Sequence, residues 1–224
     1  MSESIYLTLL MGSLVAIAYK RWLIASLLLG FMCILRANGL LMLLPVAIFI
    51  MEENGSWKKL LPSSEVFAWK NISQHLVFLV PSAVFVGYCV YQYQKTGDAF
   101  AYSTAQQKGW NREFMFPLMA LFRMGGPTGQ FNSCYAIIFI LIGIFVWKKL
   151  PLSFNLIIWL TIFLPMMSGN VEGFPRYITT AFPLFFLAGR ATFNWSWKYA
   201  LLGIALPLQL FTFYFWLTYS PFSY

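Results

Sequence analysis

Ionisable side chains are scarce in this chain, and their scarcity excludes several kinds of protein. Only 10% of the 224 residues are charged, with seven Asp and Glu against 15 Lys and Arg, while 60% are hydrophobic and the mean hydropathy is +0.70. A soluble chain of this length has no interior large enough to bury so much apolar surface. The composition therefore predicts an integral membrane protein. Its net charge of +8 is attributed to loops between helices, not to nucleic-acid binding.

Histidine and cysteine are also rare, which limits the available chemistry. His75 is the only histidine and has no cluster of His, Cys or carboxylates near it, so neither a zinc or iron site nor a Ser-His-Asp set is expected. Cys33, Cys89 and Cys134 are odd in number and form no CxxC pair, so they are interpreted as small apolar residues. The phosphate-loop pattern GxxxxGK[ST] is absent. The sequence thus predicts neither a metal nor a cofactor.

Long apolar runs, by contrast, follow one another along the whole chain. They predict an all-α polytopic membrane protein, a single membrane domain over 1–224 with about seven or eight transmembrane or re-entrant helices. The apolar segments are Ile5–Tyr19, Trp22–Leu35, Leu40–Met51, Leu76–Tyr91, Cys134–Trp147, Phe154–Ser168, Tyr177–Phe193 and Tyr199–Thr218.

The most informative interruption is the string LRANGLL, Leu35–Leu41, inside the apolar stretch Trp22–Met51. An arginine inside a bilayer costs between about 3 and 17 kcal/mol on an isolated helix, so Arg36 requires an anionic partner or an aqueous cavity. Asn38-Gly39 favours a turn at the same place. Two interpretations stay open. Arg36 either belongs to a site that binds an anion at the membrane face, or lies at a hairpin tip and snorkels to the headgroups.

The distribution of Lys and Arg favours the hairpin. If Trp22–Met51 were one span, the flanking cations would divide seven to seven and give no bias. With a hairpin they divide nine to six, which makes the larger group cytoplasmic. The larger group is Lys20, Arg21, Lys58, Lys59, Lys70, Lys148, Lys149, Arg190 and Lys198. The smaller is Arg36, Lys95, Lys108, Arg112, Arg123 and Arg176.

The loop 92–133 then lies on the outer face and is too long for a simple connector. Asp98 is its only aspartate and a weak candidate for a catalytic carboxylate, since the turn Lys95-Thr96-Gly97 is expected to keep its pKa ordinary. Groups suited to a sugar or a phosphate follow, namely Gln106, Gln107, Trp110, Asn111 and Arg112. The apolar Phe114–Phe122 fits a short interfacial segment, although an ordinary aromatic belt at headgroup level is equally open.

A second outer loop, GNVEGFPR, ends in an arginine just before an apolar helix that is expected to start at Tyr177. Pro175 is an ordinary signal for a helix start. Arg176 pairs either with a phosphate or with Glu172 in the same loop. The residues alone favour the internal pair.

Four strings, in order, resemble the PIG-V-like family, mannosyltransferases related to the enzyme that adds the second mannose of the GPI anchor. Ser2–Leu10 is similar to that family's SES-F/Y helix opening, and Arg36–Leu41 to its R-[SA]-N-G-L block. Asp98–Phe114 resembles its Y-x-x-x-Q-x-x-x-W-N loop, with Tyr102, Gln106, Trp110 and Asn111 at the matching spacing. Arg176–Phe186 resembles its closing R-[FY]-x-x-[ST]-x-x-P block.

The resemblance implies a GT-C glycosyltransferase in a bacterial inner membrane or the ER membrane. Such an enzyme transfers a sugar, here a mannose or other hexose, from a polyprenyl- or dolichyl-phosphate donor to a lipid-linked or glycan acceptor on the outer or lumenal face. Its partners would be this lipid-phosphate sugar and the membrane lipids. The implied donor- or substrate-binding residues are Arg36, Asn38, Tyr102, Gln106, Trp110, Asn111, Arg112, Glu172, Arg176 and Tyr177.

GT-C enzymes keep their catalytic carboxylate in the first outer loop, and this chain begins inside the family's middle. The resemblance thus leads us to expect the C-terminal half of such an enzyme, inactive unless a separate N-terminal half or subunit complements it. The alternative is a non-catalytic membrane protein, either a transporter-like subunit or a remnant. Transport would call for a repeat with paired broken helices, and the sequence has one interrupted segment.

Overall fold

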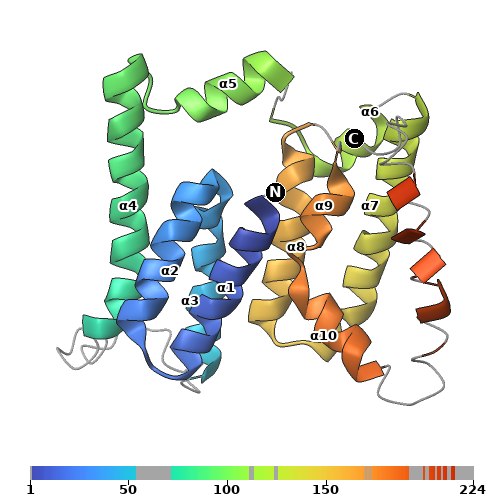
Figure 1. Ribbon diagram of the computed structural model, residues 1–224, viewed down its shortest axis with the longest axis horizontal. Coiled ribbons are helices and arrows are strands. Elements are labelled where there is room, and N and C mark those ends of the chain that lie inside the picture. The colour runs from blue at the N-terminus through green and yellow to red at the C-terminus, as the bar shows by residue number, and fades with distance from the viewer. Residues whose placement is uncertain are drawn as a thin grey trace. The chain divides into compact units, whose positions relative to one another are not determined.

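The computed structural model describes residues 2–53, 72–110, 114–123, 126–169, 171, 173–191, 199, 202–204, 206–207, 209–210 and 213–214. Within these residues all regular secondary structure is helical and no strand occurs, as the sequence predicts (Figure 1). The chain divides into two compact units. Unit 1 comprises Met1–Glu113 and Lys148–Leu160, and unit 2 comprises Phe114–Trp147 and Thr161–Tyr224.

Unit 1 is built on a bundle of apolar helices. In order along the chain they are α1 (Ser2–Ala18), α2 (Trp22–Leu35), the 3-10 helix η1 (Ala37–Met42), α3 (Leu43–Glu53), α4 (Ile72–Thr96) and α5 (Ala101–Trp110). Helices α1 and α2 run antiparallel, and α4 packs along α2 (Figure 1). Gly30 lies where α2 meets α4, facing Val80 and Val84, so a residue without a side chain lets the two helices approach closely.

The turn between α1 and α2 is a helix C-cap. Lys20 has φ +57°, and its N–H donates to Ile17 O at 2.8 Å while the N–H of Arg21 donates to Ala16 O at 2.8 Å. This pair of bonds is the Schellman pattern, which satisfies the last carbonyls of α1. The same pattern fixes the position of the Arg21 backbone, from which its side chain starts.

The second reversal of the chain occurs at Arg36. Helix α2 ends at Leu35, Arg36 is extended with φ −148° and ψ 130°, and η1 then leads into α3, which returns along the bundle (Figure 1). Gly39 in η1 crosses the backbone of α2 so closely that a Cβ there would lie 2.8 Å from Met32 O. The stretch Trp22–Met51 is therefore a hairpin, as the distribution of Lys and Arg indicates.

The C-terminal end of α3 contacts the start of α8 (Leu152–Met167), whose first half belongs to unit 1. Glu52 accepts hydrogen bonds from the backbone N–H of Ser153, at 3.2 Å, and from its hydroxyl. The rings of Phe49 and Phe154 stack one turn away, with centroids 6.1 Å apart. A carboxylate thus caps the positive N-terminal end of α8.

Unit 2 contains α7 (Gly126–Val146), the second half of α8, and the short helices η5 (Pro117–Met119), α6 (Ala120–Arg123), η6 (Trp147–Lys149, at the boundary between the units), α9 (Phe174–Ile178) and α10 (Phe182–Ala191). Its core includes Ile162, Met166 and Phe174, which are fully buried. The ring of Phe174 meets Tyr135 of α7 edge-on, with centroids 6.5 Å apart.

The predicted single segment Tyr177–Phe193 is wrong in its boundaries. The chain forms two helices there, α9 starting at Phe174 and α10 starting at Phe182. The Thr179 and Thr180 hydroxyls donate to the carbonyls three residues back, at 2.6 and 2.7 Å, and so end the first helix. Pro183, which has no N–H to donate, then fits only the first turn of a new helix.

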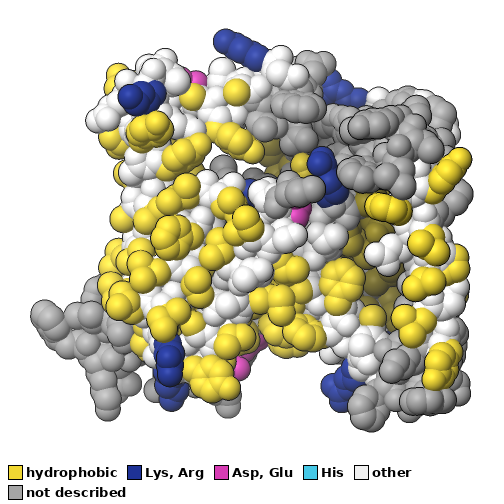
Figure 2. All heavy atoms as spheres, in the orientation of Figure 1, with side chains coloured by type: hydrophobic (Ala, Val, Ile, Leu, Met, Phe, Trp, Pro, Cys, Tyr) yellow, Lys and Arg dark blue, Asp and Glu magenta, His cyan; other side chains and the backbone are white. Residues whose placement is uncertain are grey.

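Two stretches in the described part of the chain are long and apolar enough to cross a membrane, Gln74–Thr96 and Gly129–Lys149. Three further apolar helices are shorter, namely Ser2–Ala18, Trp22–Leu35 and Leu152–Met167. Half of the expected eighth segment, Tyr199–Thr218, lies outside the described residues. On the face shown in Figure 2, hydrophobic side chains cover the helices, and most Lys and Arg lie near helix ends.

Replacing Gly39 with alanine should destabilise the protein by about 1–3 kcal/mol, because the new methyl group would overlap the α2 backbone at Met32. Gly87→Ala in α4 is the matched control, since nothing lies within 4 Å of its Cβ position and alanine favours a helix. Thermal unfolding of the purified protein in detergent measures both. Equal melting temperatures for the two variants would contradict the close crossing at Gly39.

Candidate functional site

Arg36 lies at the corner between α2 and η1 and binds the first turn of α1. Its Nη2 donates to Glu3 Oε1 at 2.5 Å, and its Nε donates to Ser2 Oγ at 3.2 Å. The side chains of Arg36 and Glu3 are only 20% and 14% exposed. The guanidinium also lies over the Tyr6 ring, 6.0 Å from its centroid, within range of a cation–π interaction. The anionic partner that Arg36 requires therefore comes from the chain itself.

The local sequence explains why these residues meet. Glu3 and Arg36 lie at nearly equal distances along the chain from the turn at Lys20, so an antiparallel helix pair brings them to the same end. Leu35 closes α2, and the extended backbone at Arg36 aims its side chain away from the helix axis. Sequence reasoning did not identify Glu3 as the partner. The equal spacing about a short turn was the available signal.

Tyr6 adds a second polar group to this cluster. Its side chain is 3% exposed, and its hydroxyl has no hydrogen-bond partner in the part of the chain that the structure describes. A buried hydroxyl without a partner costs roughly 1–3 kcal/mol. The cluster formed by Ser2, Glu3, Tyr6 and Arg36, hereafter the Arg36 cluster, thus holds a hydroxyl to which no described residue is hydrogen-bonded.

Asp98, the weak catalytic candidate, caps α5. The Thr104 hydroxyl donates to its Oδ2 at 2.6 Å, and the Phe100 N–H donates to its Oδ1 at 2.8 Å. These bonds, the one from Thr104 first, hold the pKa of Asp98 below its usual value, whereas the sequence predicted an ordinary pKa. A carboxylate with a lowered pKa and two donors already bound is a poor general base.

The rest of the predicted outer-loop site is only partly described. Tyr102 lies on α5 and is 47% exposed, and Gln107 and Lys108 on the same helix are exposed. The side chains of Asn38, Gln106 and Trp110 lie outside the described residues, as do Asn111, Arg112, Glu113 and Glu172. Their predicted roles therefore stay predictions.

The apolar segment Phe114–Phe122 is bonded to the rest of unit 2 near both of its ends, the second bond running from the Ser133 hydroxyl to Leu121 O at 2.9 Å. The N–H of Met115 donates to Met167 O at 3.1 Å, within unit 2. Phe114 and Phe122 are 81% and 86% exposed. Their exposure excludes a core role for these two rings.

Arg176 lies in the first turns of α9 and is exposed, with its N–H bonded to Gly173 O at 3.0 Å. Gly173 has φ +69°, and a Cβ there would lie 2.6 Å from Arg176 Nη2, so the guanidinium folds back over the glycine. Tyr177 beside it is half-buried. Arg36 belongs to unit 1 and Arg176 to unit 2, so the donor site that the resemblance implies for both stays a prediction.

In the described ranges, no group of three or more His, Cys, Asp and Glu is arranged to hold a metal ion. No known protein family, curated protein or solved structure matches the chain. Any functional conclusion must therefore come from the residues and their geometry.

Glu3→Gln should destabilise the protein by roughly 3 kcal/mol, because it leaves the largely buried guanidinium of Arg36 without a carboxylate. The double variant Glu3→Gln/Arg36→Met should regain most of this loss, since no unpaired charge remains. Glu53→Gln, which changes an exposed acid at the end of α3, is the control and should have no effect. Unfolding by denaturant in detergent measures the four proteins, and a double variant that is no more stable than Glu3→Gln would contradict the coupling of the pair.

The carboxylate of Asp98 should titrate below its unfolded value of about 3.8. Because the folded pKa is lowered, its capping contribution is present above the unfolded pKa and is lost as the pH falls through the folded pKa. Carboxyl NMR titration in micelles should detect this shift, and Thr104→Val should raise the pKa by removing the main donor. An ordinary pKa that Thr104→Val leaves unchanged would restore Asp98 as a candidate base.

Proposed function

We propose that this chain is a polytopic membrane protein of the GT-C glycosyltransferase type, and that the Arg36 cluster binds the phosphate of a polyprenyl- or dolichyl-phosphate sugar. The sugar would be passed to a lipid-linked or glycan acceptor. Asp98 takes no catalytic part in this proposal, because it is engaged in capping α5. The chain by itself then supplies donor binding, and the general base must come from another residue or a partner.

The exposed surface supports the membrane location. Only 11% of the most apolar window of Gln74–Thr96, and 33% of that of Gly129–Lys149, is buried inside the protein, unlike the core helices of a soluble domain. Large apolar side chains on α2, α4 and α7 face outward, among them Phe31, Leu79, Val86, Leu141 and Phe145. Such continuous apolar exposure favours contact with lipid. The exposed segment Phe114–Phe122 has a largely non-helical start, which suits the headgroup level because hydrocarbon does not tolerate unpaired backbone.

One observation carries the functional proposal. Two of the strings that resemble the PIG-V-like family, Ser2–Leu10 and Arg36–Leu41, are distant in sequence but converge on a single cluster. Each contributes the residues by which it resembles the family: Ser2, Glu3 and Tyr6 from the first, Arg36 from the second. This convergence supports a shared role for the two strings.

The chemistry of the Arg36 cluster suits a phosphate. A guanidinium binds carboxylate and phosphate oxygens through the same planar pair of N–H donors, so a donor phosphate can replace Glu3 without moving Arg36 far. The hydroxyls of Ser2 and Tyr6 belong to the same cluster and offer further donors. Glu3 then acts as the resident counter-ion that holds the site open for the incoming anion.

The second candidate is a non-catalytic membrane protein, a transporter-like subunit or a remnant. The ion pair itself favours it, since Glu3 already neutralises Arg36 and the pair then needs no ligand. The two candidates differ in whether Arg36 does anything beyond stabilising the corner between α2 and η1.

Arg36→Lys should weaken binding of polyprenyl-phosphate-mannose by about tenfold, because an ammonium cannot reproduce the planar pair of donors. Arg176→Lys should weaken binding too if that residue shares the donor. Arg190→Lys, an exposed arginine at the end of α10, is the matched control and should bind like the wild type. Binding is measured on the purified protein at two salt concentrations.

The variant Glu3→Gln/Arg36→Met separates the two candidates, because it is expected to fold without the ion pair. A stable double variant that no longer binds the donor supports the proposed function. A stable double variant, or Arg36→Lys, that binds like the wild type would contradict it and leave Arg36 with a structural role.

A further inference from the structure

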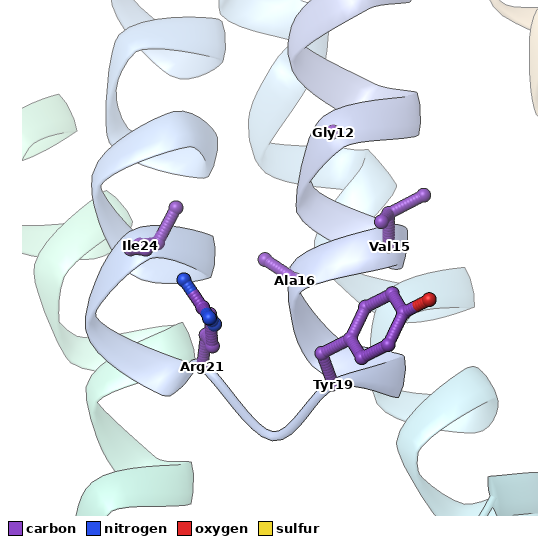
Figure 3. A pocket seen from close by; sticks show the side chains of 6 residues that line it. All are labelled: Gly12, Val15, Ala16, Tyr19, Arg21 and Ile24. Carbon is purple, nitrogen blue, oxygen red and sulfur yellow. The ribbon is translucent and has the colours of Figure 1, made fainter.

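A cavity of about 380 Å³ opens between α1 and α2 at the end of the helix pair opposite Arg36. Figure 3 shows it above the turn that joins the two helices, with one wall from each. Its lining is apolar except for one arginine and one tyrosine hydroxyl. The lining residues are Gly12, Val15, Ala16, Tyr19, Arg21 and Ile24.

Arg21 is the unusual member of this lining. Its side chain rises from the turn into the space between the helices, beside Ile24 and toward Ala16 (Figure 3). Among the described residues it forms no ion pair and no side-chain hydrogen bond. Arg21 is exposed, so its apolar stem lines the cavity while its guanidinium stays within reach of a lipid headgroup.

The backbone holds Arg21 in this place. The Schellman bonds at Lys20 and Arg21 fix the turn, so the side chain starts from a defined point at the base of the cavity. Gly12 on α1 lies close to α2, since a Cβ there would be 3.3 Å from Leu28 Cδ1, so the two helices close the cavity at this upper end. Val15 and Ile24 are 55% and 44% exposed at its edges, so the cavity opens sideways, where lipid would lie.

We propose that this cavity binds an anionic phospholipid, with the phosphate on the Arg21 guanidinium and part of one acyl chain between Gly12 and Ile24. A charged head joined to an apolar chain matches a cavity with one cation and otherwise apolar walls. The proposal rests on the membrane insertion proposed above and concerns a site separate from the Arg36 cluster. The Lys and Arg count assigns the Lys20-Arg21 turn to the cytoplasmic leaflet, whose surface is rich in anionic lipids.

The test is native mass spectrometry of the purified full chain in detergent. The probes are phosphatidylglycerol, phosphatidylcholine with the same acyl chains, and a short-chain phosphatidylglycerol. The wild type should retain long-chain phosphatidylglycerol about tenfold better than either of the others, since charge-assisted Arg–phosphate bonds and chain burial both contribute. Arg21→Gln should reduce phosphatidylglycerol to the level of phosphatidylcholine, and Arg21→Lys should fall between.

Lys95→Gln is the matched control, because it removes one positive charge from an exposed site at the other end of unit 1. It should bind phosphatidylglycerol like the wild type, and circular dichroism should confirm that all variants fold. Equal losses in Lys95→Gln and Arg21→Gln would overturn the proposal, as would full competition by inorganic phosphate. A wild-type protein that binds phosphatidylglycerol but not the polyprenyl-phosphate donor would count against the proposed function alone.

Discussion

The ion pair between Arg36 and Glu3 is the constraint on which the arrangement of unit 1 depends. An arginine in an apolar stretch has no acceptable position in lipid unless a negative charge accompanies it. Glu3 supplies that charge only if α1 and α2 run antiparallel and end at the same level. The ion pair therefore fixes how α1 and α2 are aligned at this end. The close approach of Gly39 to the α2 backbone stabilises the reversal of the chain at the same place.

The arginines at the two ends of this helix pair have different surroundings. Arg36 has a carboxylate, a hydroxyl and an aromatic ring around it, all from α1. Arg21, at the other end, is exposed, lines an apolar cavity and forms no ion pair within the described ranges. The counter-ion of Arg36 thus comes from the protein itself. For Arg21 we propose that an external anion takes this role.

The few acids of this chain are used mainly to hold helices in place. Glu52 caps α8 through Ser153, and Asp98 caps α5 through Phe100 and Thr104. Carboxylates at helix N-termini are stabilised by the helix dipole and by unpaired N–H groups. The bonds to Asp98 lower its pKa, which explains why this carboxylate is a poor general base.

The sequence by itself determined the helical class, favoured the reversal at Arg36, and required an anion or an aqueous environment beside that arginine. Apolar runs and the free energy of burying a charge are properties of single segments. It did not reveal the division of Tyr177–Phe193 into two helices. The hydroxyls of two threonines bond to backbone carbonyls there and end the first helix, and the pattern of apolar residues gives no sign of such bonds. Only the tertiary structure decided that the anion is Glu3 and that Arg21 enters a cavity. Both depend on which helices lie side by side, and residues distant in sequence carry no local signal of that.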